Sequence, residues 1–119
     1  MKKILEYWVD RLFGRVKPLA AGVYTYQSPP EVQPPSRMHL RVEPDGQSIL
    51  ILNASTVLHL NQTATEYAYH LVKGTERAEM TGKMAGRYRV SREQALYDYE
   101  ALSAQIQSII ETPDLDPET

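Results

Sequence analysis

The chain has 119 residues, of which 42% are hydrophobic, and its formal net charge is −2. This length allows one hydrophobic core and excludes two full domains. The slight negative charge gives no general attraction to nucleic acid or to anionic membranes. The absence of cysteine excludes disulfides, thiol nucleophiles and thiolate metal sites. No run approaches the ~20 apolar residues of a membrane span. We therefore expect a cytoplasmic protein with no membrane span and no nucleic-acid partner.

Residues 1–17 are predicted to hold an amphipathic helix. Its apolar residues recur at helical spacing, and Gly14 follows as a stop: Ile4, Leu5, Trp8, Val9, Leu12 and Phe13. One interpretation is that this stripe packs onto the protein's own core or forms a homodimer with a second copy. The other is a docking helix for a partner enzyme or a membrane surface, which the neighbouring lysines and arginines favour.

Residues 18–36 are predicted to be a linker. The segment holds five of the eight prolines, which lack an N–H donor and disfavour both helix and central strand: Pro18, Pro29, Pro30, Pro34 and Pro35. Val23, Tyr24 and Tyr26 could still lie as an extended segment along the body. The stretch from Ser28 to Ser36 has the composition of an exposed, polyproline-like connection.

Residues 38–43, 47–52 and 56–61 are predicted to form a three-stranded antiparallel meander. Asp45-Gly46 supplies the first tight turn, because glycine tolerates positive φ, and residues 53–55 supply the second. Four successive apolar residues at 49–52 indicate a central strand. The alternation in residues 57–61 instead indicates an edge strand with one wet face.

Three helices are predicted to cover this meander, at residues 62–73, 76–87 and 91–110. Asn61 or Thr63 can cap the first helix, with Glu66 completing a capping box after Thr63, and Gly74 ends it. Ser91 is a suitable N-cap for the third helix. The predicted core stripe of this helix consists of Ala95, Tyr99, Leu102, Ile106 and Ile109. The second helix is predicted to be weak, because each of its two interior glycines costs ~1 kcal/mol. Residues 112–119 are predicted to be an acidic tail or a link to a further segment.

From Met38 to Glu111 the chain resembles the PqqD family, small winged-helix-like domains that recognise precursors of ribosomally made, post-translationally modified peptides. The resemblance is carried by residues 49–53, 57–61, 73–75 and 87–90, and by these single positions: Ala64, Asp98, Leu102 and Ile106. It implies an α+β fold at residues 37–111, in which the meander is followed by three helices in a winged helix-turn-helix arrangement.

The resemblance also implies a binding role rather than catalysis. Such a domain captures the leader of a precursor peptide and presents it to a modifying enzyme, often a radical-SAM protein. The mechanism is strand addition, in which an extended peptide satisfies the unpaired backbone of an edge strand. We expect the backbone template at Thr56, Val57, Leu58, His59 and Leu60, and a groove lined by three residues of the last helix: Leu96, Tyr99 and Ser103. Leu96 can equally widen the core contact, and Ser103 can equally be a surface serine.

The sequence leaves three alternatives to this function. An enzyme is disfavoured, because His39, His59 and His70 have no partners at metal-ligand spacing, so neither a metal nor a cofactor is expected. A DNA-binding winged helix would use basic residues from 77 to 89, but acidic residues interleave with them. These basic residues are Arg77, Lys83, Arg87 and Arg89. A scaffold dimer held by the N-terminal helix is the third alternative.

Overall fold

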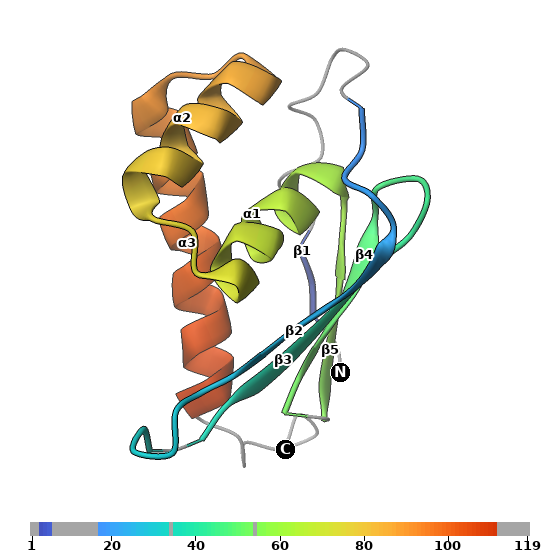
Figure 1. The fold of residues 1–119 in the computed structure, drawn as a ribbon, viewed down its shortest axis with the longest axis vertical. Helices are drawn as coiled ribbons and strands as arrows, with labels where there is room; N and C mark the ends of the chain where they lie inside the picture. Colours follow the sequence, from blue (N-terminus) through green and yellow to red (C-terminus); the bar gives the residue numbers. More distant parts are fainter. Residues whose placement is uncertain (1–2, 6–16, 34, 54, 112–119) are drawn as a thin grey trace.

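The computed structural model describes residues 3–5, 17–33, 35–53 and 55–111. It is an α+β structure of strands followed by three helices (Figure 1). The strands are β1 (Lys3–Leu5), β2 (Gly22–Gln27), β3 (Arg37–Val42), β4 (Ser48–Leu52) and β5 (Thr56–Leu60). The helices are α1 (Gln62–Lys73), α2 (Arg77–Tyr88) and α3 (Arg92–Glu111). The strands form one sheet in the order β1-β5-β4-β3-β2, in which β2 to β5 are antiparallel neighbours.

The predicted meander is confirmed as β3, β4 and β5. In its first turn Gly46 has φ +92°, and its N–H donates to the Glu43 carbonyl at 2.9 Å. In the second turn Asn53 has φ 52°, a conformation that asparagine tolerates better than most residues. The Asn53 side-chain oxygen accepts from the Arg37 N–H at 2.8 Å, which ties this turn to the start of β3.

Two predictions about the N-terminal third are corrected. Residues 18–36 are not only a linker, because Gly22–Gln27 forms strand β2 along the whole length of β3. Its alternating side chains suit a strand at the end of a sheet, where flanking prolines do no harm. Residues 3–5 form strand β1 instead of a helix, and the rest of the predicted N-terminal helix lies outside the described residues.

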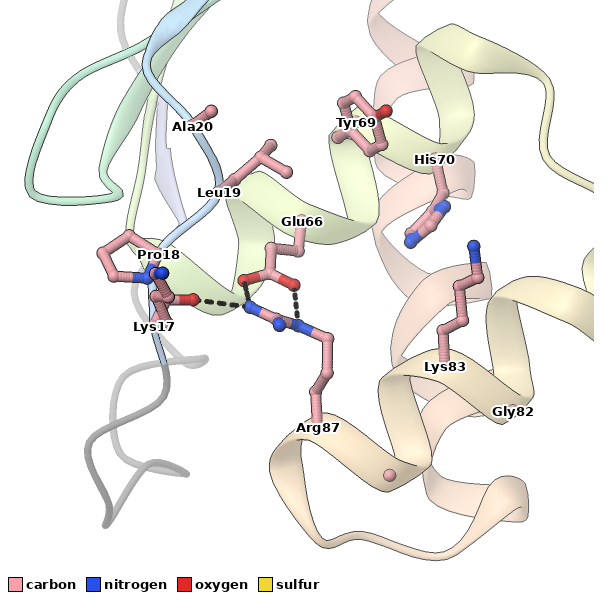
Figure 2. A pocket seen from close by; sticks show the side chains of 11 residues that line it. Lys17, Pro18, Leu19, Ala20, Glu66, Tyr69, His70, Gly82, Lys83 and Arg87 are labelled. Carbon is pink, nitrogen blue, oxygen red and sulfur yellow. Dashed lines mark hydrogen bonds and ion pairs between the residues drawn. The ribbon is translucent and has the colours of Figure 1, made fainter.

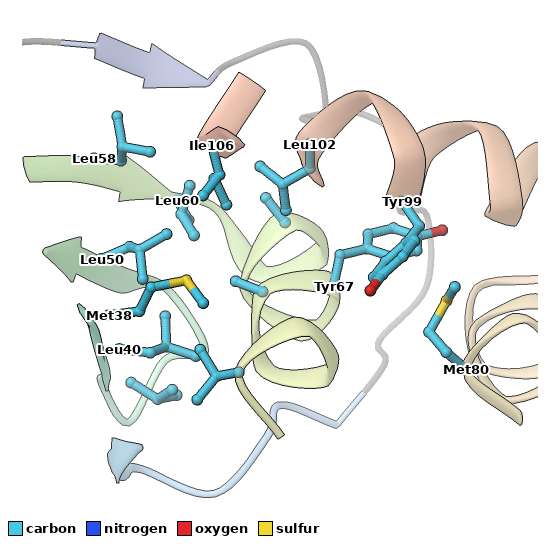
Figure 3. Close-up of a cluster of buried hydrophobic side chains, with 14 of the residues drawn as sticks. Met38, Leu40, Leu50, Leu58, Leu60, Tyr67, Met80, Tyr99, Leu102 and Ile106 are labelled. Carbon is cyan, nitrogen blue, oxygen red and sulfur yellow. The ribbon is translucent and has the colours of Figure 1, made fainter. Parts of the chain in front are cut away.

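The core lies between one face of the sheet and the helices, which lie together on that side (Figure 1). Alternation along the strands turns every second side chain inward, and Leu40, Leu50 and Leu58 are fully buried. Figure 3 shows these leucines facing Tyr67 of α1 and Leu102 of α3. The opposite face of the sheet carries a mixture of half-buried and exposed side chains, among them His39, Ile49 and His59.

The helix caps predicted from the sequence form in the structure, with one exception. Asn61 caps α1 by accepting from the Ala64 N–H at 3.0 Å, and Gly74 ends it in a left-handed conformation with φ 72°. Ser91 accepts from the Gln94 N–H at 2.9 Å and so caps α3. The predicted capping box between Thr63 and Glu66 does not form, because both residues already lie within α1. Among the described residues, no helix has the length and apolar character needed to cross a membrane.

Candidate functional site

The sequence predicts strand β5 as the free edge of the sheet. In the structure most of β5 is already paired. β1 pairs with it in parallel, with Lys3 opposite Leu58, Ile4 opposite His59 and Leu5 opposite Leu60. The expectation of an open edge is therefore wrong at residues 58–60. The physical reason is that the N-terminal residues supply the backbone groups that an edge strand otherwise leaves unpaired. A guest strand at this position would have to displace β1.

The side chains of β5 divide between the two faces of the sheet. Leu58 and Leu60 are buried in the core, whereas His59 is exposed on the other face. Thr56 and Val57 are half-buried and lie before the part of β5 that pairs with β1. The five predicted template residues are thus contiguous in one strand, but only the first two lie beyond the reach of β1.

The other end of the described sheet is strand β2, which has a single neighbour, β3. Just beyond β2, the Ser28 N–H donates to the Ser36 carbonyl at 2.9 Å. Because hydrogen-bonded pairs alternate in an antiparallel ladder, Tyr26 and Tyr24 bond to β3 in the same way. The N–H and C=O groups of Val23, Thr25 and Gln27 therefore point outward along the free edge.

β2 itself carries none of the side chains that usually protect an edge strand. Its sequence, Gly-Val-Tyr-Thr-Tyr-Gln, has no charge and no proline, and the side chain of Val23 is 62% exposed. The inward-facing tyrosines hold the strand against the helices. Tyr24 packs edge-on against Tyr69 of α1 with ring centroids 5.0 Å apart, and its hydroxyl donates to the Ala20 carbonyl at 3.2 Å.

A groove of about 460 Å³ begins where β2 ends. One wall is α3, which contributes Tyr99 and Ser103 to the lining; the other wall includes Tyr26 of β2 and Met38 of β3. Two of the three predicted groove residues are therefore brought together, beside β2 and not beside β5. Leu96 is half-buried one turn earlier on α3 and is not among the residues that line this groove.

Tyr99 is held in place at the groove by its surroundings. Burial raises the pKa of its hydroxyl, and the nearby Arg77 charge opposes this shift. The guanidinium carbon of Arg77 lies 5.7 Å from the centre of the Tyr99 ring, a cation–π distance, and Arg77 also pairs with Glu100. The ring thus presents a neutral, aromatic surface to the groove.

The histidines are distributed over separate parts of the structure. His39 is half-buried and His59 exposed on the open face of the sheet, while His70 is buried on α1. The Nδ1 atom of His70 lies 3.0 Å from the Thr75 hydroxyl. In the described part of the chain, no group of three or more histidine or acidic side chains is placed to hold a metal ion.

Three of the four basic residues considered as phosphate contacts are engaged by carboxylates. Arg77 pairs with Glu100, and Lys83 pairs with Glu79 at 3.1 Å. Arg87 pairs with the buried Glu66 at 2.6 Å. The fourth, Arg89, is exposed at the end of α2 with φ 56°. Three of the four basic residues thus face a carboxylate of their own, so the four do not form a coherent basic stripe.

The sequence interpretation missed the outward backbone groups of Val23, Thr25 and Gln27. The signal was present, since valine, tyrosine and threonine favour strands and alternate here in a period of two. Proline density in residues 18–36 outweighed it. No family model, curated protein or solved structure matches the chain. The resemblance to the PqqD family accordingly stays a prediction.

Proposed function

We propose that this chain is a non-catalytic peptide-binding domain. It captures the leader of a ribosomally made precursor peptide as an added strand and presents the peptide to a modifying enzyme such as a radical-SAM protein. The observation that carries the proposal is the unprotected edge of β2 running into the groove lined by Tyr99 and Ser103. An edge and an adjoining groove are the two elements that peptide recognition by strand addition uses.

In this proposal the guest strand lies along β2. The sequence alone suggests β5 instead. The outward N–H and C=O groups of Val23, Thr25 and Gln27 bond to the guest backbone and supply affinity. A guest side chain near the end of β2 enters the groove, where Tyr26, Met38 and Tyr99 offer apolar surface. The groove volume of about 460 Å³ accommodates a large apolar side chain.

Calorimetry against short peptides encoded beside this gene tests the proposal. Thr25→Pro removes one outward donor, and proline is tolerated where an edge N–H faces solvent. We expect it to weaken binding about fivefold or more, since one hydrogen bond contributes ~1 kcal/mol. Thr25→Val keeps the N–H and is the matched control, with affinity close to that of the unchanged chain. Equal affinity of both variants would refute binding at β2.

Removing residues 1–5 separates the two edges. If the guest binds at β5, the truncated chain binds more tightly because β1 no longer competes for Leu58, His59 and Leu60. If the guest binds at β2, the truncation leaves affinity unchanged. Measuring molar mass in solution tests the alternative of a scaffold dimer held by the N-terminal segment, which removal of residues 1–17 would dissociate. The β2 edges of two copies can also pair, and a dimer that Thr25→Pro dissociates would favour self-association at β2 instead.

A further inference from the structure

A second cavity, of about 650 Å³, lies between α1, α2 and residues 17–20, and it shares no lining residue with the groove beside β2. Its α2 wall includes Gly82 and Gly86, which lie one turn apart on one face of the helix. A Cβ atom added at Gly86 would meet no atom within 4 Å. Gly86 therefore leaves open space on the α2 wall of the cavity, in a helix that alanine would stabilise.

One side of the cavity presents a firmly held cation, Arg87 (Figure 2). Its Nε and Nη2 atoms donate to the two carboxylate oxygens of Glu66 at 2.6 Å, and Nη2 also donates to the Lys17 carbonyl at 2.7 Å. The Tyr88 hydroxyl donates to the same carboxylate at 2.6 Å. These bonds fix the guanidinium in one orientation and leave its Nη1 donors unused within the described residues.

The other side of the cavity adds further donors. Lys83 and His70 extend toward one another in Figure 2, from α2 and α1 respectively. Lys83 pairs with Glu79, but both side chains are more than half exposed, at 56% and 54%, so water weakens this pair. Lys17 also lines the cavity. The lining thus holds three cations and one carboxylate, and that carboxylate is already engaged by Arg87 and Tyr88.

The rest of the lining is largely apolar. Pro18, Leu19 and Ala20 form one wall, and the Tyr69 ring lies beside His70 on α1. A site with this character suits a ligand that combines one negative charge with a compact apolar body. Bare inorganic anions would leave the apolar wall unused, and neutral apolar molecules would make no use of the Arg87 Nη1 donors or of the weakly paired Lys83.

We propose that this cavity binds a small organic carboxylate. The carboxylate lies between Arg87 and Lys83, and the apolar body packs against Leu19 and Tyr69. The inference is independent of peptide binding at β2, because no residue belongs to both sites.

Titration of the ¹⁵N-labelled full chain with phenylacetate and with hexanoate, followed by amide NMR shifts, tests this site. We expect saturable shifts in α1 and α2 with at least one of these carboxylates, and much weaker binding of phenylacetamide and of inorganic phosphate. Lys83→Met should weaken carboxylate binding roughly tenfold, as expected for the loss of a charged hydrogen bond. Glu79→Gln releases Lys83 and should tighten binding about twofold to threefold.

Two further variants complete the experiment. Gly86→Leu adds a bulky side chain to the α2 wall of the cavity and should weaken binding, whereas Lys73→Met, at the end of α1 and outside the cavity, should leave affinity unchanged. The proposal is overturned if neither carboxylate saturates, if phenylacetamide binds as well as phenylacetate, or if phosphate binds as well as both. It is also overturned if Lys83→Met and Glu79→Gln change affinity in the same direction. This comparison still decides the proposal if Gly86→Leu does not fold.

Discussion

Arg87→Met tests whether the contact between α1 and α2 depends on a buried charge. The Glu66 side chain is 4% exposed and that of Arg87 is 37% exposed, so the carboxylate is inside and water reaches the guanidinium. Leaving a buried carboxylate without its cation costs ~3–5 kcal/mol when both groups are buried. Because Arg87 is partly solvated, we expect a smaller loss in the free energy of unfolding, about 2–3 kcal/mol.

Urea unfolding followed by circular dichroism measures this loss. Lys83→Met is the matched control. Lys83 lies one turn earlier on α2, and both side chains of its pair with Glu79 are exposed. We expect the control to change stability by less than about 0.5 kcal/mol. If Arg87→Met costs no more than Lys83→Met, the Glu66 pair behaves as a surface salt bridge and the reasoning is wrong.

The remaining predictions concern two glycines and one histidine. Gly86→Ala should raise the free energy of unfolding by about 0.5–1 kcal/mol, because its Cβ meets nothing within 4 Å and alanine favours helix. Gly46→Ala should lower the free energy of unfolding by about 1–3 kcal/mol, because φ is +92° and the added Cβ would lie 2.9 Å from the Pro18 Cβ. Both predictions are wrong if urea unfolding shows Gly46→Ala to be the more stable variant. Burial, assisted by Lys83, lowers the pKa of His70 below its usual 6.5. As the pH falls below 6.5, His70 takes up a proton in the unfolded chain before it does so in the folded chain. The free energy of unfolding therefore declines until the pH is below the pKa of His70 in the folded chain. Between about pH 7.5 and 5.5 wild type should therefore lose more stability than His70→Gln, and equal losses would exclude His70 as the cause.

Part of the candidate site could be predicted from sequence because it depends on one element at a time. Tyr99 and Ser103 share a face of α3 by helical spacing alone, and the structure places both in one groove. What the groove faces could not be predicted, because its second wall comes from β2 and β3. Glu66 illustrates the same limit, since a carboxylate expected near a helix start instead pairs with Arg87, 21 residues away in the chain.

The sequence by itself determined the local structure from Arg37 to Glu111: three strands, two turns and three helices, with ends set by Gly46, Asn61 and Gly74. Alternation, helical spacing, capping and positive φ are properties of a few adjacent residues, so they can be predicted without the fold. Only the tertiary structure decided which strands form the edges of the sheet. Lys3–Leu5 pairs with β5, more than fifty residues later, so the described sheet ends in β1 on one side and in β2 on the other. Pairing between distant segments uses backbone groups that every residue carries, so the side-chain pattern of residues 3–5 and 22–27 did not indicate their neighbours in the sheet.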